Sequence, residues 1–335
     1  MQKLEVFGAN KLKGQISISG SKNASLPILA ATVLSNNKIY LKNLPKVKDI
    51  ETMIKLLESL GSKVKFRKKK FIVDNSNQKK KFASYNLVKT MRAGILVLGP
   101  LLAKFKNAKV SLPGGCAIGT RPVDIHLKAL SKLGVKYKII QGYVHATAPK
   151  GLIGSKIRFS KISVGATGNV LMAAILAKGT TVITNAAAEP EIQQLCQMLN
   201  QMGANIYGIG SNTLTIKGVD SLKSIEDISV IPDRIEAGTF LIAAAGLFSM
   251  GIYGILVRRN AVMVLLSIEL ILNAVNINFV VFNQMLSDVL LNGQIFTVFI
   301  ITIAAAEVGI GLAIVLMLFR NRQTANINEF DLMKW

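Results

Sequence analysis

The chain changes composition abruptly at Ala245 and Gly246, where a lysine-rich sequence gives way in mid-helix to a nearly uncharged one. From Gly246 onward the 335-residue chain holds five basic and five acidic residues, which leaves 36 of its 41 Lys and Arg and 13 of its 18 Asp and Glu before that point. The whole formal net charge of +23 therefore belongs to the first 245 residues. The two parts have to be interpreted separately.

The positive charge of the first part suits nucleic acid, an anionic membrane surface or small anionic substrates, because a positive potential attracts all three. Most of the excess is scattered Lys, and we expect the basic runs at 67–70 and 79–81 to be solvated hairpin surface. The first 20 residues lack the apolar core of a secretory signal, so we expect this part to be made and to remain in the cytoplasm. The two cysteines, Cys116 and Cys196, predict no disulfide framework.

A unit of roughly 70 residues recurs before Ala245, and its clearest sign is an amphipathic helix between two strands. These helices end in Leu-Gly or Met-Gly, at Gly61, Gly134 and Gly203. A more apolar helix opens each unit, and the three are expected at 23–34, 87–103 and 165–177. Alternating strands and helices at this spacing predict an α/β domain over residues 1–237, with helices packed against sheets. A fourth unit starts at Asp233 and does not finish.

A glycine-rich segment carries the first candidate chemistry. Residues 113–126 read P-G-G-C-A-I-G-T-R-P-V-D-I-H, which indicates a mobile loop that exposes the Cys116 thiol near the Arg121 cation. A thiol beside a cation is a plausible proton donor or nucleophile, although a buried structural cysteine in a turn is the alternative. Cys196 lies among apolar helix residues and is expected in the core.

Two cations are candidate anion-binding groups. Residues 19–23 read S-G-S-K-N at a strand-to-helix junction, where Lys22 and unpaired backbone N–H groups suit a phosphate. Arg92, near the start of a helix, could hold a second anion in fork geometry, although an isolated arginine is usually a surface group.

Six motifs together resemble the UDP-N-acetylglucosamine 1-carboxyvinyltransferase family. They are S-G-S-K-N, T-M-R-A, L-P-G-G-C-A-I-G-T-R-P-V-D-I-H, S-V-G-A-T, E-P-E and P-D-R-I-E-A-G-T-F. The resemblance implies three βαβαββ units, which form one of two similar domains in that family. It also implies transfer of enolpyruvyl from phosphoenolpyruvate to the sugar nucleotide, a step toward peptidoglycan. Both substrates are anions, which fits the basic composition without nucleic acid.

The resemblance also implies roles for individual residues. Cys116 would be the general acid, and Lys22, Asn23 and Arg121 would hold phosphoenolpyruvate. The sugar-nucleotide site would be lined by Arg92, Arg121, Pro122, Val123, Asp124, Ile125, Lys161, Ile162, Ser163 and Val164. The family takes its general-base aspartate from a C-terminal portion that this sequence does not have, so we expect the transferase part to be truncated and inactive on its own.

The second part contains three long apolar runs, at about 238–257, 261–282 and 295–319, each long enough to span a bilayer as a helix. Glu269 and Glu307 lie near the middle of the second and third runs, where a carboxylate is costly unless it pairs, hydrates or keeps its proton. Such residues usually carry protons or ions, and the alternative is that they join helices together. Asn273 and Asn276 extend a polar stripe from Glu269, and small residues around Glu307 favour close helix packing.

This part resembles subunit K of the proton-pumping NADH-quinone oxidoreductase, respiratory complex I. The motifs are G-I-L-V-R-R-N, S-I-E-L-I-L-N-A-V-N-I-N-F, N-G-Q-I-F, A-A-A-E-V-G-I-G-L-A and N-I-N-E-F-D-L-M-K-W. The resemblance implies a proton path through Glu269 and Glu307, partners among the other membrane subunits, and a place in the bacterial inner membrane. It implies no nicotinamide, flavin or iron–sulfur centre in the subunit, and we expect no cofactor or metal in either part. Residues 238–245 replace the first half of that family's first helix.

The positive-inside rule places Arg258 and Arg259, and also Arg320 and Arg322, in the cytoplasm. The first part would then face the periplasm, away from the substrates that its resemblance implies. Three hypotheses follow: a transferase fragment, a proton-translocating membrane subunit, and a chimera of two reading frames with no joint function. The chimera is favoured, because both resemblances lose pieces at the same point. A basic nucleic-acid module is the remaining alternative.

Overall fold

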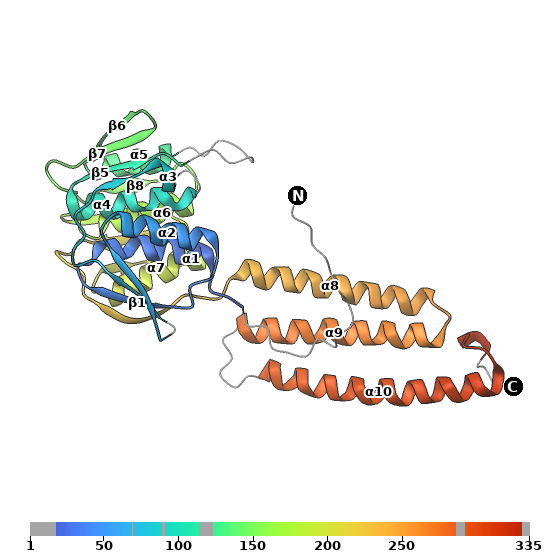
Figure 1. Ribbon diagram of the computed structural model, residues 1–335. Coiled ribbons are helices and arrows are strands. Elements are labelled where there is room, and N and C mark those ends of the chain that lie inside the picture. Colours follow the sequence, from blue (N-terminus) through green and yellow to red (C-terminus); the bar gives the residue numbers. More distant parts are fainter. Residues whose placement is uncertain (1–17, 69, 89–90, 114–122, 286–291, 330–335) are drawn as a thin grey trace. The chain divides into compact units, whose positions relative to one another are not determined.

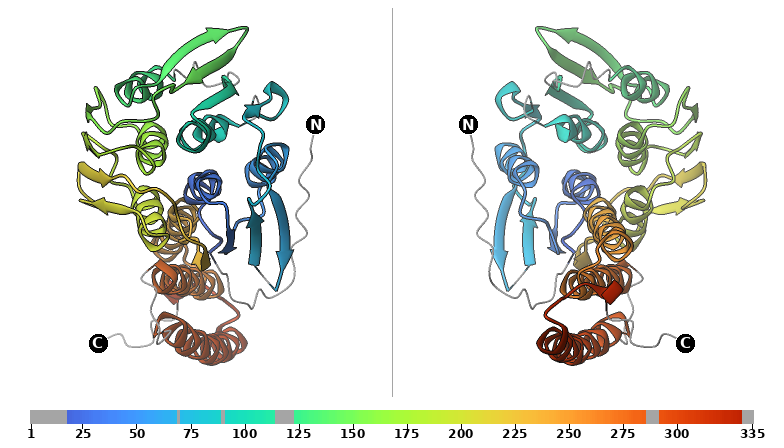
Figure 2. Two further views of the ribbon diagram at one scale, coloured as in Figure 1. Left: turned by 90° about the vertical axis from the view of Figure 1, so that its left-hand side faces the viewer. Right: turned by 90° about the vertical axis from the view of Figure 1, so that its right-hand side faces the viewer.

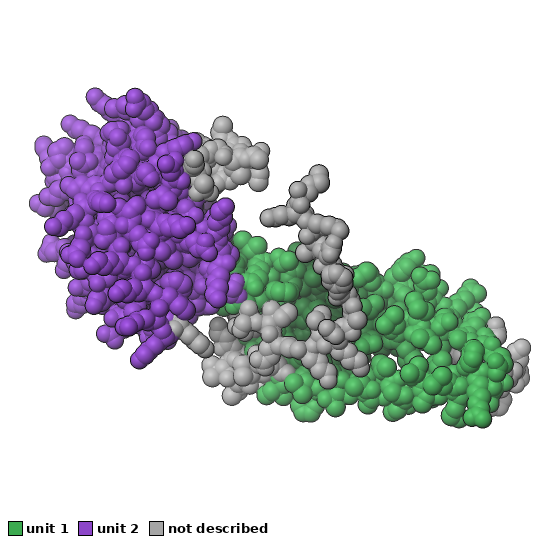
Figure 3. Space-filling view, viewed as in Figure 1, with its two compact units in different colours: residues 1–18, 232–335 green, residues 19–231 purple. Residues whose placement is uncertain are grey.

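The computed structural model describes residues 18–68, 70–88, 91–113, 123–285 and 292–329, and it contains two compact units. One unit is Ser19–Ile231, and the other comprises the described residues from Pro232 onward together with Ile18 (Figure 3). The first unit is built of strands and helices and the second of helices (Figure 1). The compact α/β unit of the structure ends at Ile231.

Three four-stranded sheets are present among the described residues of the α/β unit, with strand orders β12-β1-β3-β2, β4-β5-β7-β6 and β10-β11-β9-β8. Their strands are β1 (Lys38–Lys42), β2 (Lys63–Arg67), β3 (Lys70–Asp74), β4 (Phe82–Ala83), β5 (Asn107–Ser111), β6 (Lys136–Ile140), β7 (Tyr143–Thr147), β8 (Lys156–Arg158), β9 (Thr180–Thr184), β10 (Asn205–Tyr207), β11 (Thr213–Lys217) and β12 (Ile225–Ser229). In each sheet, an antiparallel hairpin lies at one edge (β2–β3, β6–β7 or β10–β11), and one strand pairs in parallel at the opposite edge (β12, β4 or β8).

The parallel edge strand of each sheet comes from the end of the preceding repeat. β4 pairs with β5 and β8 with β9, while β12 pairs with β1, so that Ile225 lies opposite Ile39 and Ser229 opposite Lys42. The strand that follows the third repeat therefore completes the sheet of the first. This arrangement confirms the predicted α/β class with helices packed against sheets, and the sheets do not close on themselves.

Each repeat contributes one outer and one inner helix, and the sheets lie around the helices (Figure 2). The outer helices α2 (Lys48–Ser59), α5 (Asp124–Lys132) and α7 (Pro190–Gln201) bury one face, as their amphipathic patterns predicted. The inner helices are α1 (Lys22–Ala31), which continues as η1 (Thr32–Leu34), α4 (Leu98–Phe105) and α6 (Val164–Ala174). Every residue from Ala166 to Ala174 is buried, so α6 lies in the centre of the core.

The helix expected over residues 87–103 is divided. The chain forms α3 (Tyr85–Val88), then the 3₁₀ helix η2 (Arg92–Val97), and then α4. Pro100 has no N–H group to donate to the carbonyl of Leu96, which accounts for a tighter turn immediately before α4. Arg92 consequently begins η2 rather than lying within a long α-helix.

The second unit contains three helices long and apolar enough to cross a membrane, all within its described residues: α8 (Arg234–Val257), α9 (Ala261–Met285) and α10 (Asn292–Arg322). A 3₁₀ turn, η3 (Ile327–Glu329), follows α10. All three helices extend beyond the apolar runs that predicted them, α9 at its C-terminal end only. α8 starts early because the Asp233 side chain accepts hydrogen bonds from the N–H groups of Ile235 and Glu236 and so caps a polar first turn.

α8 passes through Ala245 and Gly246 without a break and packs against α9. The buried residues of α8 are Ala237, Ala244 and Gly251, which are spaced seven apart and therefore lie on one face. A β-carbon at Gly251 would lie 2.8 Å from the backbone oxygen of Ser267 on α9. Small residues thus allow close approach of the two helices on both sides of the composition change.

Candidate functional site

The first candidate residues, Lys22 and Asn23, open α1 in the α/β unit. Ser21 caps this helix, because its Oγ accepts a hydrogen bond from the Ala24 N–H at 3.3 Å. The Lys22 ammonium lies 3.1 Å from the Asp49 carboxylate in the first turn of α2, and Asn23 is exposed. The predicted anion-binding lysine is therefore held beside a helix start by an ion pair.

A second group of candidates opens α5 and α6. Val123 is buried and precedes α5, Asp124 is exposed, and Ile125 is half-buried. Ser163 caps α6 by accepting from the Ala166 N–H at 3.3 Å.

The residues around the α6 cap are open to solvent. Lys161 is exposed, and the apolar side chains of Ile162 and Val164 are 58% and 37% exposed. A cation and two exposed apolar side chains therefore surround a helix start, which is a combination suited to an anionic ligand with an apolar part.

Other candidates are only partly described. Arg92 begins η2, and Cys116, Arg121 and Pro122 lie in 114–122, outside the described residues. Cys196 is fully buried on α7, and burial raises the pKa of its thiol to about 12. This confirms the interpretation of Cys196 as a core residue, because a neutral buried thiol is a poor nucleophile.

Two residues that the sequence analysis did not single out connect these segments. Asn169 on α6 donates to the carbonyl of Ile95 at 3.0 Å and accepts from the Gly99 N–H at 2.6 Å. It also lies 3.1 Å from His126 Nδ1 on α5. An asparagine within the apolar α6 sequence was the available signal, since a buried polar side chain must find partners.

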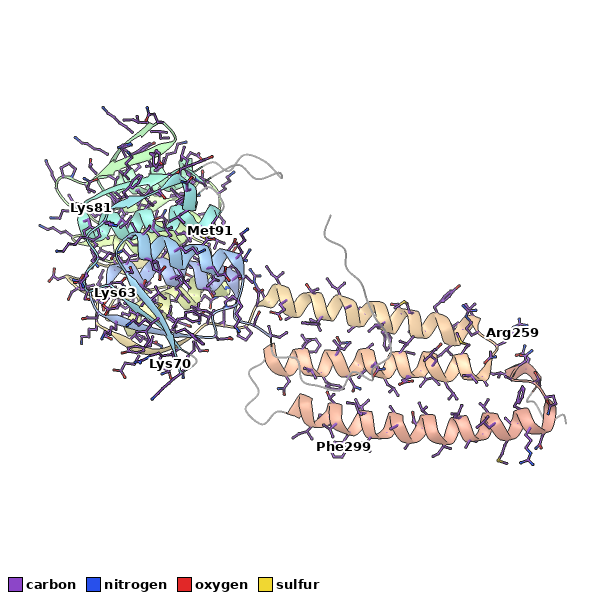
Figure 4. The ribbon with its side chains drawn as sticks, in the orientation of Figure 1. Lys63, Lys70, Lys81, Met91, Arg259 and Phe299 are labelled. Carbon is purple, nitrogen blue, oxygen red and sulfur yellow. The ribbon has the colours of Figure 1, made fainter. Side chains whose placement is uncertain are left out.

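The basic run at 67–70 lies at the β2–β3 hairpin, and Figure 4 labels Lys70 at its tip. Residues 65–68 are exposed, as expected of a solvated hairpin. Asp227 on β12 pairs with Lys42 at 2.7 Å and with Lys70 at 3.6 Å. The hydrogen bond from Lys42 is the main reason that the pKa of Asp227 lies below its usual range.

The second unit brings Glu269 and Glu307 to one cavity. This cavity, of about 400 Å³, lies between α9 and α10, and its other lining residues are Leu265, Ile268, Leu272, Ala304 and Val308. The lining is apolar except for these two carboxyl groups. When water is present, each carboxyl group of such a cavity can take up and release a proton. The structure thus places the two predicted proton-path glutamates at the same cavity.

Neighbouring polar and small residues have distinct positions. Asn273 is exposed, whereas Asn276 is buried and its Oδ1 has no hydrogen-bond partner within the described part of the chain. A β-carbon at Gly311 would lie 2.8 Å from the Leu265 side chain of α9, so Gly311 permits close packing, whereas Gly309 faces open space. Only part of the expected small-residue surface on α10 is therefore used against α9. Phe299 projects from the side of α10 away from α9 (Figure 4).

The loop after α8 and the segment after α10 are bonded to each other. The Ile327 N–H donates to the carbonyl of Arg259 at 2.7 Å, and the Ala261 N–H donates to that of Ala325 at 2.8 Å. Arg258, Arg259 and Arg320 therefore belong to the same end of the three-helix bundle, where Figure 4 labels Arg259. α8 begins at the other end.

Solved structures share the fold of the α/β part. The enolpyruvyl transferase NikO from Streptomyces tendae aligns with a TM-score of 0.60 at 20% identity, over 72% of this chain and 56% of that one. An EPSP synthase from Acinetobacter baumannii aligns with a TM-score of 0.57 at 17% identity, over 70% and 53%.

Curated relatives are much closer in sequence. The UDP-N-acetylglucosamine 1-carboxyvinyltransferase of Pelagibacter ubique is 71% identical over 245 residues, and that of Sulfurovum sp. is 55% identical over 246 residues. Each alignment covers 73% of this chain and 58% of the relative. The chain therefore spans less than two thirds of the length of these proteins.

Two sequence families account for the chain. Residues 239–335 match NADH-ubiquinone/plastoquinone oxidoreductase chain 4L, and residues 6–252 match EPSP synthase (3-phosphoshikimate 1-carboxyvinyltransferase). Both matches include 239–252, which lies within α8. The chain belongs to the EPSP synthase family and is chimeric, because from α8 onward it continues as a three-helix segment of the chain 4L type.

Proposed function

We propose that the α/β unit binds UDP-N-acetylglucosamine and phosphoenolpyruvate but does not complete enolpyruvyl transfer on its own. The observation that carries the proposal is the 71% identity over 245 residues to the Pelagibacter ubique carboxyvinyltransferase. The exposed cation and apolar residues at the start of α6, and Lys22 at the start of α1, support it. Catalysis requires acid and base groups on opposite sides of one cleft, and the match covers only 58% of the relative.

Calorimetric titration of the full chain in detergent with UDP-N-acetylglucosamine tests the binding. We expect saturable binding that weakens at least tenfold in Lys161→Ala. The control is Lys132→Ala, because Lys132 is an exposed lysine at the C-terminal end of α5, whereas the candidate site residues lie at its N-terminal end. Release of inorganic phosphate from phosphoenolpyruvate is measured in parallel. Release that depends on the sugar nucleotide would contradict the proposed lack of turnover, and an absence of binding would contradict the proposed site.

A second function belongs to the membrane part. The three apolar helices and the chain 4L match support membrane insertion, and we propose that the membrane is a bacterial inner membrane. Glu269 and Glu307 are proposed to exchange protons through their shared cavity when the other membrane subunits of complex I cover it. The observation that carries this proposal is the meeting of both glutamates at one cavity.

Expression of the full chain in a bacterium that lacks its own chain 4L subunit tests the second function. NADH-driven proton uptake by inverted vesicles should appear with the unchanged chain and fall at least tenfold in Glu269→Gln and Glu307→Gln. Glu236→Gln is the matched control, because Glu236 lies in the first turn of α8 and outside the cavity. Equal uptake in all three variants would show that the two glutamates merely join helices.

We also propose that the two parts have no joint function. The arginine-bearing end of the bundle would face the cytoplasm, and the α/β unit would then attach from the periplasmic side, away from both of its proposed substrates. A single long sequencing read of DNA and transcript across the codons for Ala245 and Gly246 is the direct test. Two separate loci are expected, and an unbroken transcript would establish a fusion expressed as one chain.

A further inference from the structure

Asn169 is a fully buried polar residue in the middle of an apolar helix. Its neighbours along α6, from Ala166 to Ala174, are all buried as well. A buried amide is costly unless its donors and acceptor are used, so its partners show what the residue does.

The backbone partners of Asn169 fix the orientation of its amide. The Gly99 atom that contacts this amide is its backbone nitrogen, whose N–H can only donate, so the Asn169 atom 2.6 Å from it must be the oxygen Oδ1. The Ile95 atom in contact is its carbonyl oxygen, which can only accept, so the Asn169 atom 3.0 Å from it must be the nitrogen Nδ2. The second hydrogen of Nδ2 is therefore left for His126 Nδ1, at 3.1 Å.

This orientation determines the tautomer of His126. Because Nδ2 of Asn169 can only donate, Nδ1 of His126 must accept, and the imidazole proton of the neutral ring must be on Nε2. The ring is buried and lies close to the start of α6, since a β-carbon at Gly165 would be 3.3 Å from its Cε1.

Each partner of Asn169 belongs to a segment that opens with residues of the proposed sugar-nucleotide site. Ile95 and Gly99 follow Arg92, and His126 follows Asp124 and Ile125 at the start of α5. Asn169 itself is in the helix that opens with Ser163 and Val164.

The close packing of α4 on α6 is what makes the Gly99 bond possible. A β-carbon at Gly99 would lie 2.1 Å from the backbone oxygen of Asn169, so only glycine allows this approach. From α6, the Asn169 side chain thus bonds both to the segment formed by η2 and α4 and to α5.

We propose that Asn169 is a positioning residue that holds the starts of η2, α5 and α6 in the geometry needed to bind the sugar nucleotide. The inference rests on the proposed function of the α/β unit. Asn169 acts through these segments, and its hydrogen bonds couple the tautomer of His126 to the arrangement of all three.

Two variants test this proposal in the full chain in detergent. Asn169→Asp keeps an acceptor for the Gly99 N–H but has no donor for Ile95 or for His126 Nδ1. His126→Phe retains a ring and removes the bond between His126 on α5 and Asn169 on α6. The matched control is Asn200→Asp, because Asn200 also uses both ends of its amide, with Ile206 as its partner through bonds of 2.9 Å, and lies on α7.

Calorimetry with UDP-N-acetylglucosamine should show at least tenfold weaker binding in Asn169→Asp, about fivefold weaker binding in His126→Phe, and a change below twofold in Asn200→Asp. Nitrogen NMR of the chain's two histidines should show an unprotonated Nδ1 for His126, and a protonated Nδ1 in Asn169→Asp. A purely structural role would not weaken binding in a variant whose thermal midpoint equals that of the control, and the tautomer checks the assigned hydrogen bond.

The outcomes separate the two proposals. Failure of the unchanged chain to bind would overturn the proposed function, and the inference with it. Unchanged binding in His126→Phe and in a folded Asn169→Asp would overturn the inference alone. If Asn169→Asp does not fold, His126→Phe decides, since it leaves both backbone bonds of Asn169 in place. A protonated His126 Nδ1 in the unchanged chain would overturn the assigned hydrogen bonds.

Discussion

Lys104, on α4, is a lysine whose ammonium is largely withdrawn from water. Its Nζ donates to Gln78 Oε1 at 3.0 Å and to the carbonyl of Ser35 at 3.4 Å, and no acidic side chain pairs with it among the described residues. Burial lowers the pKa of Lys104 from 10.5 to about 8. The protein therefore loses stability by keeping this amine charged at neutral pH.

The magnitude follows from the change in pKa. Each pKa unit is worth about 1.4 kcal/mol, so a fall from 10.5 to about 8 corresponds to an upper limit of about 3.5 kcal/mol. Solvent relaxation and the two hydrogen bonds reduce the effect to about 1–2 kcal/mol. Between pH 8 and 10.5 the unfolded chain holds a proton that the folded chain has lost, so this contribution makes stability rise with pH.

Urea unfolding of the α/β unit, followed by circular dichroism in detergent, measures this effect. Lys104→Met should be more stable than the unchanged chain at pH 7, and its advantage should shrink by about 1 kcal/mol by pH 9.5. Lys132→Met, at an exposed position of α5, should show no such trend. If the difference in the free energy of unfolding between Lys104→Met and the unchanged chain does not vary with pH, the reasoning is refuted, because burial then does not lower the pKa of the amine.

Three further predictions concern packing, reactivity and topology. Gly251→Val should separate α8 from α9 and lower the thermal midpoint of the helical unit, whereas Gly309→Val, which faces open space, should leave it unchanged. Cys196 should resist alkylation at pH 8, as read by mass spectrometry, until urea unfolds the chain, because it is buried and its pKa is raised to about 12. In intact cells a membrane-impermeant maleimide should label Cys116 if the arginine-bearing end of the bundle is cytoplasmic; labelling only after lysis would reverse this topology.

The sequence predicts the repeats and the membrane helices well, because both depend on local periodicity. Leucine and isoleucine spacing defines the outer helices, and long uncharged runs define α8, α9 and α10. The pairing of β12 with β1 was not predictable, since it joins residues about 185 apart and no local pattern specifies it. The division of the helix at residues 92–97 was also missed, although Pro100 was its visible cause.

The candidate site shows the same limit. Motif similarity points to residues at the starts of α1, α5 and α6, and the structure shows that Ser21 and Ser163 cap two of these helices. Asn169 was missed because its role depends on partners 43, 70 and 74 residues away in the chain. Similarly, hydropathy predicts that Glu269 and Glu307, 38 positions apart, lie within membrane-spanning helices. Only the packing of α9 against α10 places them at one cavity.

The composition change falls inside α8, and the geometry of that helix explains how two unrelated sequences can share it. Ala237 and Ala244 come from one side and Gly251 from the other, and all three face inward because the spacing of seven continues across Ala245 and Gly246. One alanine inserted between Ala245 and Gly246 would rotate the second half of the helix by about 100° relative to the first. Either Gly251 or the pair Ala237 and Ala244 would then no longer face α9.

We therefore expect this insertion to lower the thermal midpoint of the helical unit and to increase its cleavage by protease in detergent. Gly246→Ala is the matched control, because it adds the same methyl group at a position with open space around it and does not change the register. If the insertion is tolerated as well as the substitution, the continuous small-residue face of α8 does not hold it against α9. The two halves of α8 would then pack against α9 independently of each other, and the register of small residues across Ala245 and Gly246 would not matter.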